Sequence, residues 1–384
     1  FGVPASRGMT HENPFGWNQG FHNEEEQGRT NASLFEDILQ QEMLGGLVFT
    51  WQDEWFKRTW NTLELDNPDR RPYWSNAQTN EQQFGLLSFD KHKVKLDGDA
   101  ADWADTKALY SAGEQSQLQS LKVDHDERYL YLNLQMSKSA IGDWEKKDLL
   151  FLFDNGKAGG NTVSSIKSEF AVAGIDFVLH VNGKQNARLL ADSYYDPFYF
   201  QYSEQLSFLE KEPYHGTQDS GIFHPIRLAL NKPITIPSTG ETLPFNYYET
   251  GTFRYGIGNP EDPAYDALSD FYVDEKEGII EVRIPWLMLN FRDPGQKEII
   301  GDLWKEGMTA SSATEGISIS VLSVSGLDRQ SGSLELSSLN VLDKLPASGN
   351  SMKMYSWESW DLPQSEERLK KSYYILQELY GKHK

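Results

Sequence analysis

The sequence contains no cysteine, which excludes disulfide bonds and thiolate metal sites. It also has no run of 18 or more apolar residues, the length that a membrane-spanning helix needs. Positively charged residues are scarce: the sequence has 36 Lys and Arg and 57 Asp and Glu, which gives a net charge of −21. A polyanion would be repelled, so the composition argues against nucleic acid and anionic membrane surfaces as partners.

Aromatic residues, in contrast, are abundant. They make up 13% of the 384 residues and include 11 Trp and 18 Tyr. Aromatic rings stack on the apolar faces of pyranose rings, and an uncharged glycan is not repelled by an acidic protein. Carbohydrate is therefore the partner that the composition favours, and the length suggests two or three domains.

Residues 45–60, GGLVFTWQDEWFKRTW, join a short apolar run to clustered aromatic and acidic side chains. We predict a buried strand over Leu47–Trp51, because the run follows two glycines directly. Carboxylates accept sugar hydroxyls and indoles stack on sugar rings, so Trp51, Asp53, Glu54 and Trp55 are predicted substrate-binding residues. A buried strand followed by a surface loop that tryptophan anchors is the alternative.

Residues 1–28 are rich in Gly, Pro, Asn and His without any period, which predicts a long loop. Loops of this kind commonly carry function. We therefore predict that His11, Asn13, Trp17 and His22 line the same site. The alternative is a solvated loop with Trp17 tucked inward.

From Asn31 the apolar residues recur at helical spacing, and Gly45 is placed to end the helix. Loop, helix, glycine pair and buried strand make one αβ unit of a parallel α/β architecture. In a (β/α)8 barrel, residues just beyond the carboxyl end of a strand face the active site. Trp51 and Asp53 hold that position.

The order Phe-Gly-Val-Pro, His/Asn/Trp-rich loop, helix and GGLVFTWQDEW resembles the last quarter of a glycoside hydrolase barrel. The similar clan includes the family 2 β-galactosidases and the family 5 enzymes. The resemblance implies that Phe1 and Gly2 follow the nucleophile of strand seven, and that Trp51 lies beneath the sugar at the end of strand eight. The nucleophile and the acid/base would then both precede Phe1, so no catalytic residue is assigned in this chain.

The chain begins without an initiator methionine or a signal peptide, so we expect it to be the C-terminal part of a longer protein. The upstream barrel segment would be its intramolecular partner. A processed mature N-terminus is the alternative. A polysaccharide substrate and the absence of cysteine suggest an extracellular or cell-surface location.

After Lys91 the hydrophobic period changes to two. Strands are predicted around Leu130–Met136, Leu149–Phe153, Phe177–Val181, Ile280–Ile284 and Ile317–Val321. Asn-Gly pairs at 155–156 and 182–183 predict hairpins. Many short strands with few helices indicate a β-sandwich of the jelly-roll type.

Three motifs of this region resemble family 9 carbohydrate-binding modules: LDGD followed by DW, VD followed by YLYL, and EVRIPW. The resemblance implies a glycan-binding module. Residues 193–270 form a long aromatic-rich stretch that departs from that family. This stretch forms either a glycan-binding face or a surface that packs against the barrel, so the module either binds glycan or serves as a rigid lid.

No cofactor is predicted, apart from a possible structural calcium ion. Its carboxylate ligands would be Asp97, Asp99 and Asp102, or Asp124 and Asp126. No bidentate glutamate follows at the twelfth position, so turn-forming aspartates are the alternative.

The predicted fold is therefore α/β plus all-β, with a C-terminal barrel segment, a β-sandwich and a C-terminal helix. The boundaries are 1–90 for the barrel portion, 91–345 for the sandwich and 346–384 for a tail with a helix around Leu369–Tyr380. The expected function is a retaining glycoside hydrolase with an appended sandwich. Two alternatives remain: a non-catalytic glycan-binding or cell-surface protein with a degenerate barrel, and a sandwich that residues 1–90 merely decorate.

Overall fold

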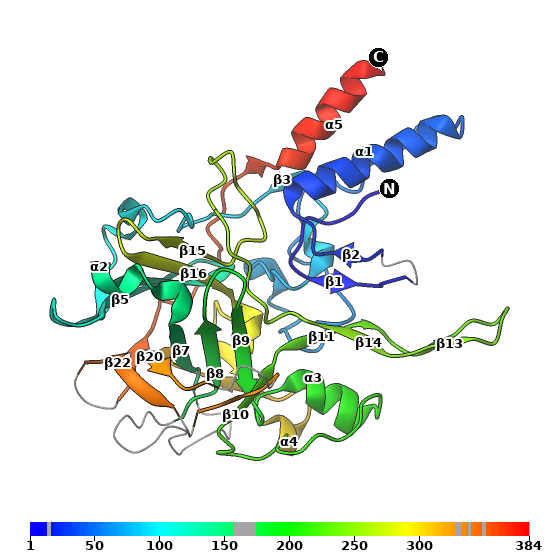
Figure 1. Cartoon of the computed structure of the whole chain (residues 1–384). Helices are drawn as coiled ribbons and strands as arrows, with labels where there is room; N and C mark the ends of the chain where they lie inside the picture. The colour runs from blue at the N-terminus through cyan, green and yellow to red at the C-terminus, as the bar shows by residue number, and fades with distance from the viewer. Residues whose placement is uncertain (14–16, 157–173, 328–331, 337–338, 348–350, 384) are drawn as a thin grey trace.

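The computed structural model describes residues 1–13, 17–156, 174–327, 332–336, 339–347 and 351–383. Most of its regular structure is strand, and two antiparallel sheets dominate (Figure 1). The smaller sheet has five strands in the order β15 (Phe271–Asp274), β16 (Ile279–Pro285), β6 (Tyr129–Met136), β5 (Leu118–His125) and β4 (Ala108–Ser111).

The larger sheet has eight strands. Seven run in the order β21 (Leu334–Glu335), β10 (Ile222–Pro225), β9 (Ala187–Asp192), β8 (Phe177–Val181), β7 (Asp148–Asp154), β20 (Ile317–Ser325) and β22 (Asn340–Leu345). The eighth, β23 (Lys353–Tyr355), also pairs with β20. All five strands predicted from the period-two pattern are present.

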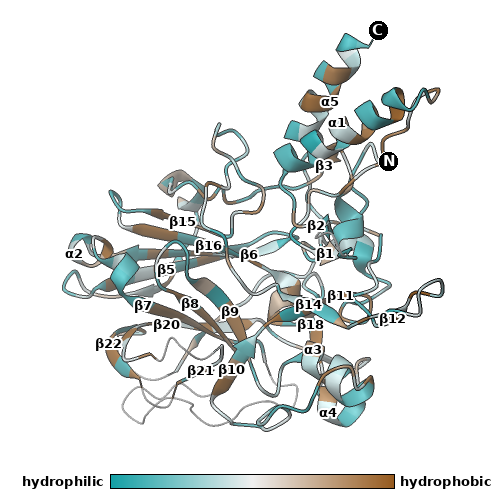
Figure 2. Ribbon diagram, turned by 45° about the vertical axis from the view of Figure 1, so that its right-hand side comes forward, coloured by the Kyte–Doolittle hydropathy of each residue, from teal (hydrophilic) through white to brown (hydrophobic). Residues whose placement is uncertain are grey.

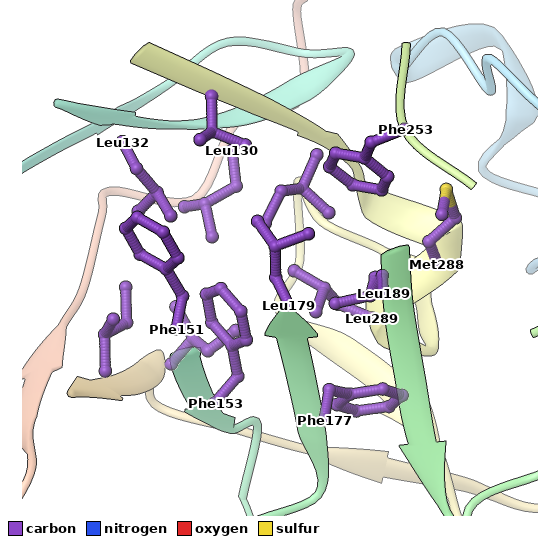
Figure 3. Close-up of a cluster of buried hydrophobic side chains, with 14 of the residues drawn as sticks. Leu130, Leu132, Phe151, Phe153, Phe177, Leu179, Leu189, Phe253, Met288 and Leu289 are labelled. Atoms are coloured by element: carbon purple, nitrogen blue, oxygen red, sulfur yellow. The ribbon is translucent and has the colours of Figure 1, made fainter. Parts of the chain in front are cut away.

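The core lies between the two sheets (Figure 3). Leu130 and Leu132 of β6 meet Phe151 and Phe153 of β7, and all four side chains are fully buried. The intervening Leu150 and Leu152 are also buried, in a second cluster on the opposite face of the larger sheet. Central strands such as β7 and β8 are therefore apolar on both faces, as their colouring in Figure 2 shows.

The Asn182-Gly183 turn joins β8 to β9 as predicted, with Gly183 at a φ of +82°. Strands β7 and β8 pair antiparallel, as the hairpin predicted at Asn155-Gly156 requires, but the predicted tight turn is wrong, because the connection between them spans 155–176. Residues 157–173 of that connection lie outside the described residues. Gly156 nevertheless turns the chain, at a φ of +110°.

Several short strands form ribbons outside the sandwich. They are β1 (Met9–Thr10) with β2 (Gln19–Gly20), β11 (Arg227–Asn231) with β14 (Asn246–Glu249), β12 (Ile234–Thr235) with β13 (Thr242–Leu243), and the three-stranded β17 (Phe291–Asp293), β18 (Glu298–Ile300) and β19 (Ser311–Ala313). Strands β11 to β14 build one long hairpin, 227–249, which projects from the body and is here called the arm (Figure 1).

Helix α1 (Glu24–Gln40) begins earlier than predicted from Asn31, because Asn23 caps it. The Asn23 side chain accepts from the N–H groups of Glu25 and Glu26, and Glu26 reciprocates in a capping box. The other helices are α2 (Lys138–Ile141), α3 (Pro197–Tyr199) continuing into a π-helical segment (Phe200–Gln205), α4 (Leu303–Glu306) and α5 (Lys371–Lys382). Short 3₁₀ segments cover Arg71–Tyr73, Asn80–Gln83, Ala100–Trp103, Trp144–Lys146 and Trp286–Leu289. In the described part of the chain, none of the helices has the length and apolar character needed to cross a membrane.

The regular strand predicted over Leu47–Trp51 does not form. Its backbone is nevertheless tied to two segments: the Phe49 N–H donates to the Phe1 carbonyl at 2.8 Å, and the Thr50 N–H donates to the Phe84 carbonyl at 3.1 Å. A parallel bridge joins Gln52 to Leu87. The segment therefore has isolated bridges instead of a continuous ladder, and the antiparallel sheet expected from a purely decorative segment is not observed.

The C-terminal tail returns to the N-terminal residues. Strand β24 (Arg368–Leu369) pairs with β3 (Leu87–Ser88), and α5 lies beside α1 (Figure 1). Leu376 and Leu379 of α5 share an apolar cluster with Leu86 and with partly buried Phe35 and Val48. The predicted helix of the tail is confirmed, and it packs against the first ninety residues.

Candidate functional site

Three of the predicted site residues lie on the hairpin formed by β1 and β2. Asn13 and Trp17 form its turn, where the Trp17 N–H donates to the Asn13 side chain at 3.0 Å. The Trp17 indole is 72% exposed and therefore available for stacking, in contrast to the alternative in which it is tucked inward. His11 is also exposed, and its ring lies 5.9 Å from that of Trp60.

The arm, which projects from the sandwich, contacts this hairpin. The Asn246 side chain donates to the Glu12 carboxylate at 2.6 Å, and the Asn231 side chain donates to the Glu12 carbonyl at 2.7 Å. Asn61 adds a bridge, since its amide donates to the carbonyls of both Met9 and Ala229 at 2.8 Å. The contacts made by residues of the arm join positions more than 160 apart, and neither period nor motif indicates them.

His22 lies just before helix α1. Burial lowers the pKa of His22, and the neighbouring Glu26 partly opposes that effect. Its Nδ1 atom is buried without a hydrogen-bond partner among the described residues. His22 is therefore a neutral imidazole at pH 7 and is less accessible than His11.

Trp51 lies on the other predicted segment. Its indole is 54% exposed and contacts the ring of Tyr373 in α5 edge-on, at 6.0 Å between centroids. It does not line the hollow described below. Large apolar side chains around it are also exposed: Met43, Leu44, Leu47, Phe49 and Phe56.

Asp53 is buried beneath this surface. Its carboxylate accepts from the Lys370 ammonium at 2.8 Å and from the Gly85 N–H at 2.9 Å. Burial raises the pKa of Asp53 to about 6 and outweighs the opposing effect of Lys370. A sugar hydroxyl could reach this carboxylate only if the tail moved away.

Glu54 and Trp55 follow and are held by one residue, Gln82. The Glu54 N–H donates to the Gln82 carbonyl at 2.9 Å, and the Gln82 amide donates to the Trp55 carbonyl at 2.6 Å. The Glu54 carboxylate lies 3.6 Å from the Lys57 ammonium, whereas the Trp55 side chain is buried. Of the four predicted residues in this segment, Trp51 and Glu54 thus retain exposed surface for a ligand.

A hollow of about 300 Å³ lies between the β5–β6 turn and residues 358–364 of the tail. Lys91, Lys93, His125, Glu127 and Glu358 line it. Burial, and next the neighbouring Asp126, raise the pKa of Glu127 to about 9, so this carboxyl holds its proton at pH 7. The hollow combines a neutral carboxyl donor, two ammonium donors and a free carboxylate, a set suited to a polar ligand.

Sequence reasoning does not find this hollow, because its walls come from the β5–β6 turn and from the tail, more than 230 positions later. Trp360 closes one side: its ring stacks on His125 at 5.8 Å, and its Nε1 donates to the Tyr73 carbonyl at 2.7 Å. Trp357 and Trp360, which stand close together in the tail sequence, are the signal that points to this contact.

The aspartates considered for calcium are occupied by hydrogen bonds within the chain. Asp97 accepts from the Asp99 N–H at 2.9 Å and from the Asn259 side chain at 2.7 Å, and Asp102 accepts from the Lys95 N–H at 2.7 Å. Asp126 accepts from two backbone N–H groups and from the Tyr131 hydroxyl. Asp124 bonds Lys93, and these contacts are typical of turn-forming aspartates.

Comparisons with known proteins do not assign the chain to a family. No protein-family model matches it, and no curated protein sequence is significantly similar to it.

Proposed function

We propose that this chain belongs to a carbohydrate-active protein of the retaining glycoside hydrolase type. Residues 1–90 would form the closing part of its (β/α)8 barrel. The observation that carries the proposal is that the two segments on either side of helix α1 are joined by backbone hydrogen bonds. Phe1 donates to the Leu47 carbonyl at 3.0 Å and accepts from the Phe49 N–H at 2.8 Å, the alternation expected of parallel neighbours.

The exposed apolar surface supports the same proposal. Leu44 and Leu47 have relative exposures of 111% and 89%, and Phe49 and Trp51 are also exposed. A contiguous apolar patch usually marks an interaction surface. The remaining barrel strands would cover Leu44 and Leu47, and Trp51 would then border the sugar site.

The exposed indole of Trp17 is the second proposed sugar contact. Glu12, beside it on the β1–β2 hairpin, is held by the arm, so the sandwich positions a loop of the proposed active site. His11, Asn13 and Glu54 would contact sugar hydroxyls, as polar groups around a stacked ring do. The catalytic nucleophile and acid/base are expected among residues that precede Phe1, about 5 Å apart as retention requires.

The proposal can be tested on the natural protein, including whatever precedes Phe1. The parent, a variant with alanine at the position before Phe1, and the control variant Glu367→Ala are assayed on a panel of aryl glycosides and exopolysaccharides. We expect turnover by the parent and the control and loss in the first variant. Equal turnover by all three would remove the nucleophile assignment.

A second candidate is non-catalytic glycan binding by the sandwich, which the hollow at Glu127 favours. Its protonated carboxyl and two ammonium groups can donate to sugar oxygens, and Glu358 can accept. Calorimetric titration of this chain with oligosaccharides tests it directly. Binding that Glu127→Gln and Glu358→Gln weaken, and Glu367→Gln leaves unchanged, together with no turnover by the natural protein, would favour this candidate.

A further inference from the structure

Two histidines and a glutamate meet at one end of the larger sheet, beside α3 and β10 (Figure 1). His224 belongs to β10, whereas Glu212 and His215 lie in the loop between the π-helical segment and β10. One possible ligand atom from each residue lies within 4.8 Å of the other two. The ring of His215 is held between Tyr199 at 3.7 Å and His224 at 4.1 Å, measured between centroids.

The hydrogen bonds of His215 show which ring nitrogen is free. Its Nε2 lies 3.2 Å from the Asp196 carboxylate. Asp196 also accepts from the Tyr199 N–H at 3.0 Å and from the Arg227 guanidinium at 3.1 Å, so its carboxylate is the acceptor. The His215 Nε2 therefore carries the hydrogen and Nδ1 carries a lone pair.

That Nδ1 atom has no hydrogen-bond partner among the described residues, and the His215 side chain is fully buried. The Glu212 carboxylate is the nearest acidic group, at 3.8 Å, which is too long for a hydrogen bond. A buried nitrogen lone pair without a donor is costly unless a ligand uses it.

His224 is held through its other ring nitrogen. Its Nε2 lies 2.9 Å from the Ser193 hydroxyl oxygen. The Ser193 Oγ also lies 3.0 Å from the Ile222 carbonyl oxygen, which can only accept, and 3.2 Å from the Ser220 hydroxyl. With the Ser193 proton on the Ile222 carbonyl, the Nε2 of His224 donates to Ser193 and its Nδ1 carries the lone pair that a metal ion needs.

We propose that His215, His224 and Glu212 bind a divalent transition-metal ion such as Zn²⁺. Two neutral imidazoles and one carboxylate form a common ligand set for zinc, with water at the remaining position. The Asp196–His215 hydrogen bond is the outer contact that orients a ligating histidine. Tetrahedral Zn²⁺ holds its ligand atoms about 3.3 Å apart, so the partly exposed Glu212 side chain would rotate inward on binding.

The charges around the site are compatible with a cation. Arg227 is the nearest cationic side chain among the described contacts, and its guanidinium lies 3.1 Å from Asp196 and 3.5 Å from Glu212. The site thus has two carboxylates, Asp196 and Glu212, and one guanidinium, Arg227. The ion would fasten the loop that carries Glu212 and His215 to the larger sheet.

Metal binding is tested on the chain after dialysis against a chelator. Zn²⁺ is titrated by calorimetry, Co²⁺ binding is followed by visible absorption, and Tm is measured with and without Zn²⁺. We expect one equivalent of Zn²⁺, a nitrogen-ligated Co²⁺ spectrum and a higher Tm with Zn²⁺. His215→Ala and His224→Ala should each abolish stoichiometric binding, and Asp196→Asn should weaken it about 10- to 100-fold.

His383→Ala, which changes an exposed histidine in the last turn of the chain, is the matched control and should bind Zn²⁺ as the parent does. Circular dichroism and urea unfolding in chelator show that each variant is folded without metal. A folded parent that binds no equivalent of Zn²⁺ would overturn the proposal. So would unchanged binding in both histidine variants, or binding of Ca²⁺ with equal affinity, because calcium selects oxygen ligands.

Discussion

Lys370 places its ammonium 2.8 Å from the carboxylate of Asp53, and both side chains are buried although 317 positions separate them. Nearby, Arg368 forms two hydrogen bonds with the Glu24 carboxylate, at 3.0 and 2.5 Å. The tail thus supplies the cations that neutralise acids of the first ninety residues. Burial of such pairs makes the loss of one partner costly.

We predict that Lys370→Met destabilises the chain by about 3–5 kcal/mol at pH 8, because it leaves a buried carboxylate unpaired. The loss should shrink below pH 6, since burial raises the pKa of Asp53 to about 6 and the protonated acid needs no counter-ion. Urea unfolding of the variant and the parent measures the loss of stability at pH 5 and at pH 8. Lys382→Ala, which breaks the exposed pair with Glu378, is the control and should leave stability nearly unchanged at both pH values. An equal loss at the two pH values would contradict the assignment.

Glu127→Gln should stabilise the protein increasingly as the pH rises from 4.5 to 9. The folded state holds a proton on Glu127, whose pKa burial raises to about 9, whereas the unfolded chain releases it near pH 4.5. The parent therefore loses stability over this range, and the uncharged amide does not. Thermal unfolding across pH 4–9 tests this. A constant difference in Tm between variant and parent would show that Glu127 ionises normally.

Trp17→Ala should leave the free energy of unfolding within about 0.5 kcal/mol of the parent, because the indole is mostly exposed. Under the proposed function it should weaken carbohydrate binding. Trp55→Ala is the contrasting variant and should cost about 3–5 kcal/mol, because that side chain is buried. Denaturant titration and calorimetry with oligosaccharides separate the two effects. Unchanged affinity in Trp17→Ala would remove this residue from the sugar site.

Leu132→Ala should cost about 2–5 kcal/mol, because it opens a cavity between the two sheets at a fully buried position. Leu362→Ala, at a position that is 82% exposed, serves as the control and should change stability by less than about 0.5 kcal/mol. Equilibrium unfolding in urea compares them. A small effect at Leu132 would mean that the inter-sheet core is less tightly packed than described.

The sandwich is predictable from local pattern because its strands alternate or are continuously apolar. Leu130, Leu132 and Leu134 alternate with residues on the outer face of β6, and β7 is apolar on both faces because clusters cover both sides of its sheet. The start of α1 is also encoded locally, in the Asn23–Glu26 capping box, but the apolar stripe beginning at Leu34 conceals it. Local rules therefore account for the strands and for the helix once its cap is identified.

The candidate sites are less predictable because their partners are distant in sequence. Asp53 carries the sequence signature of a ligand-binding carboxylate, yet Lys370 pairs with it and the tail covers it. The hollow at Glu127 joins the β5–β6 turn to the tail, more than 230 positions later. The histidine cluster lies within residues 212–224, but its spacing matches no ligand motif, so only the fold shows that its members meet. Leu47–Trp51 reads as a buried strand, but it makes only separate backbone hydrogen bonds and no ladder, and Leu47, Phe49 and Trp51 are exposed.

The pairing of β24 with β3 and of α5 with α1 has a practical consequence. A shortened version of this protein ending after the sandwich would strip α1 of its neighbour and leave Asp53 and Glu24 without their cations. Such a product should be prone to aggregation and to digestion near residues 24–90. Residues 1–90 and the tail should therefore be kept together when the protein is divided for expression.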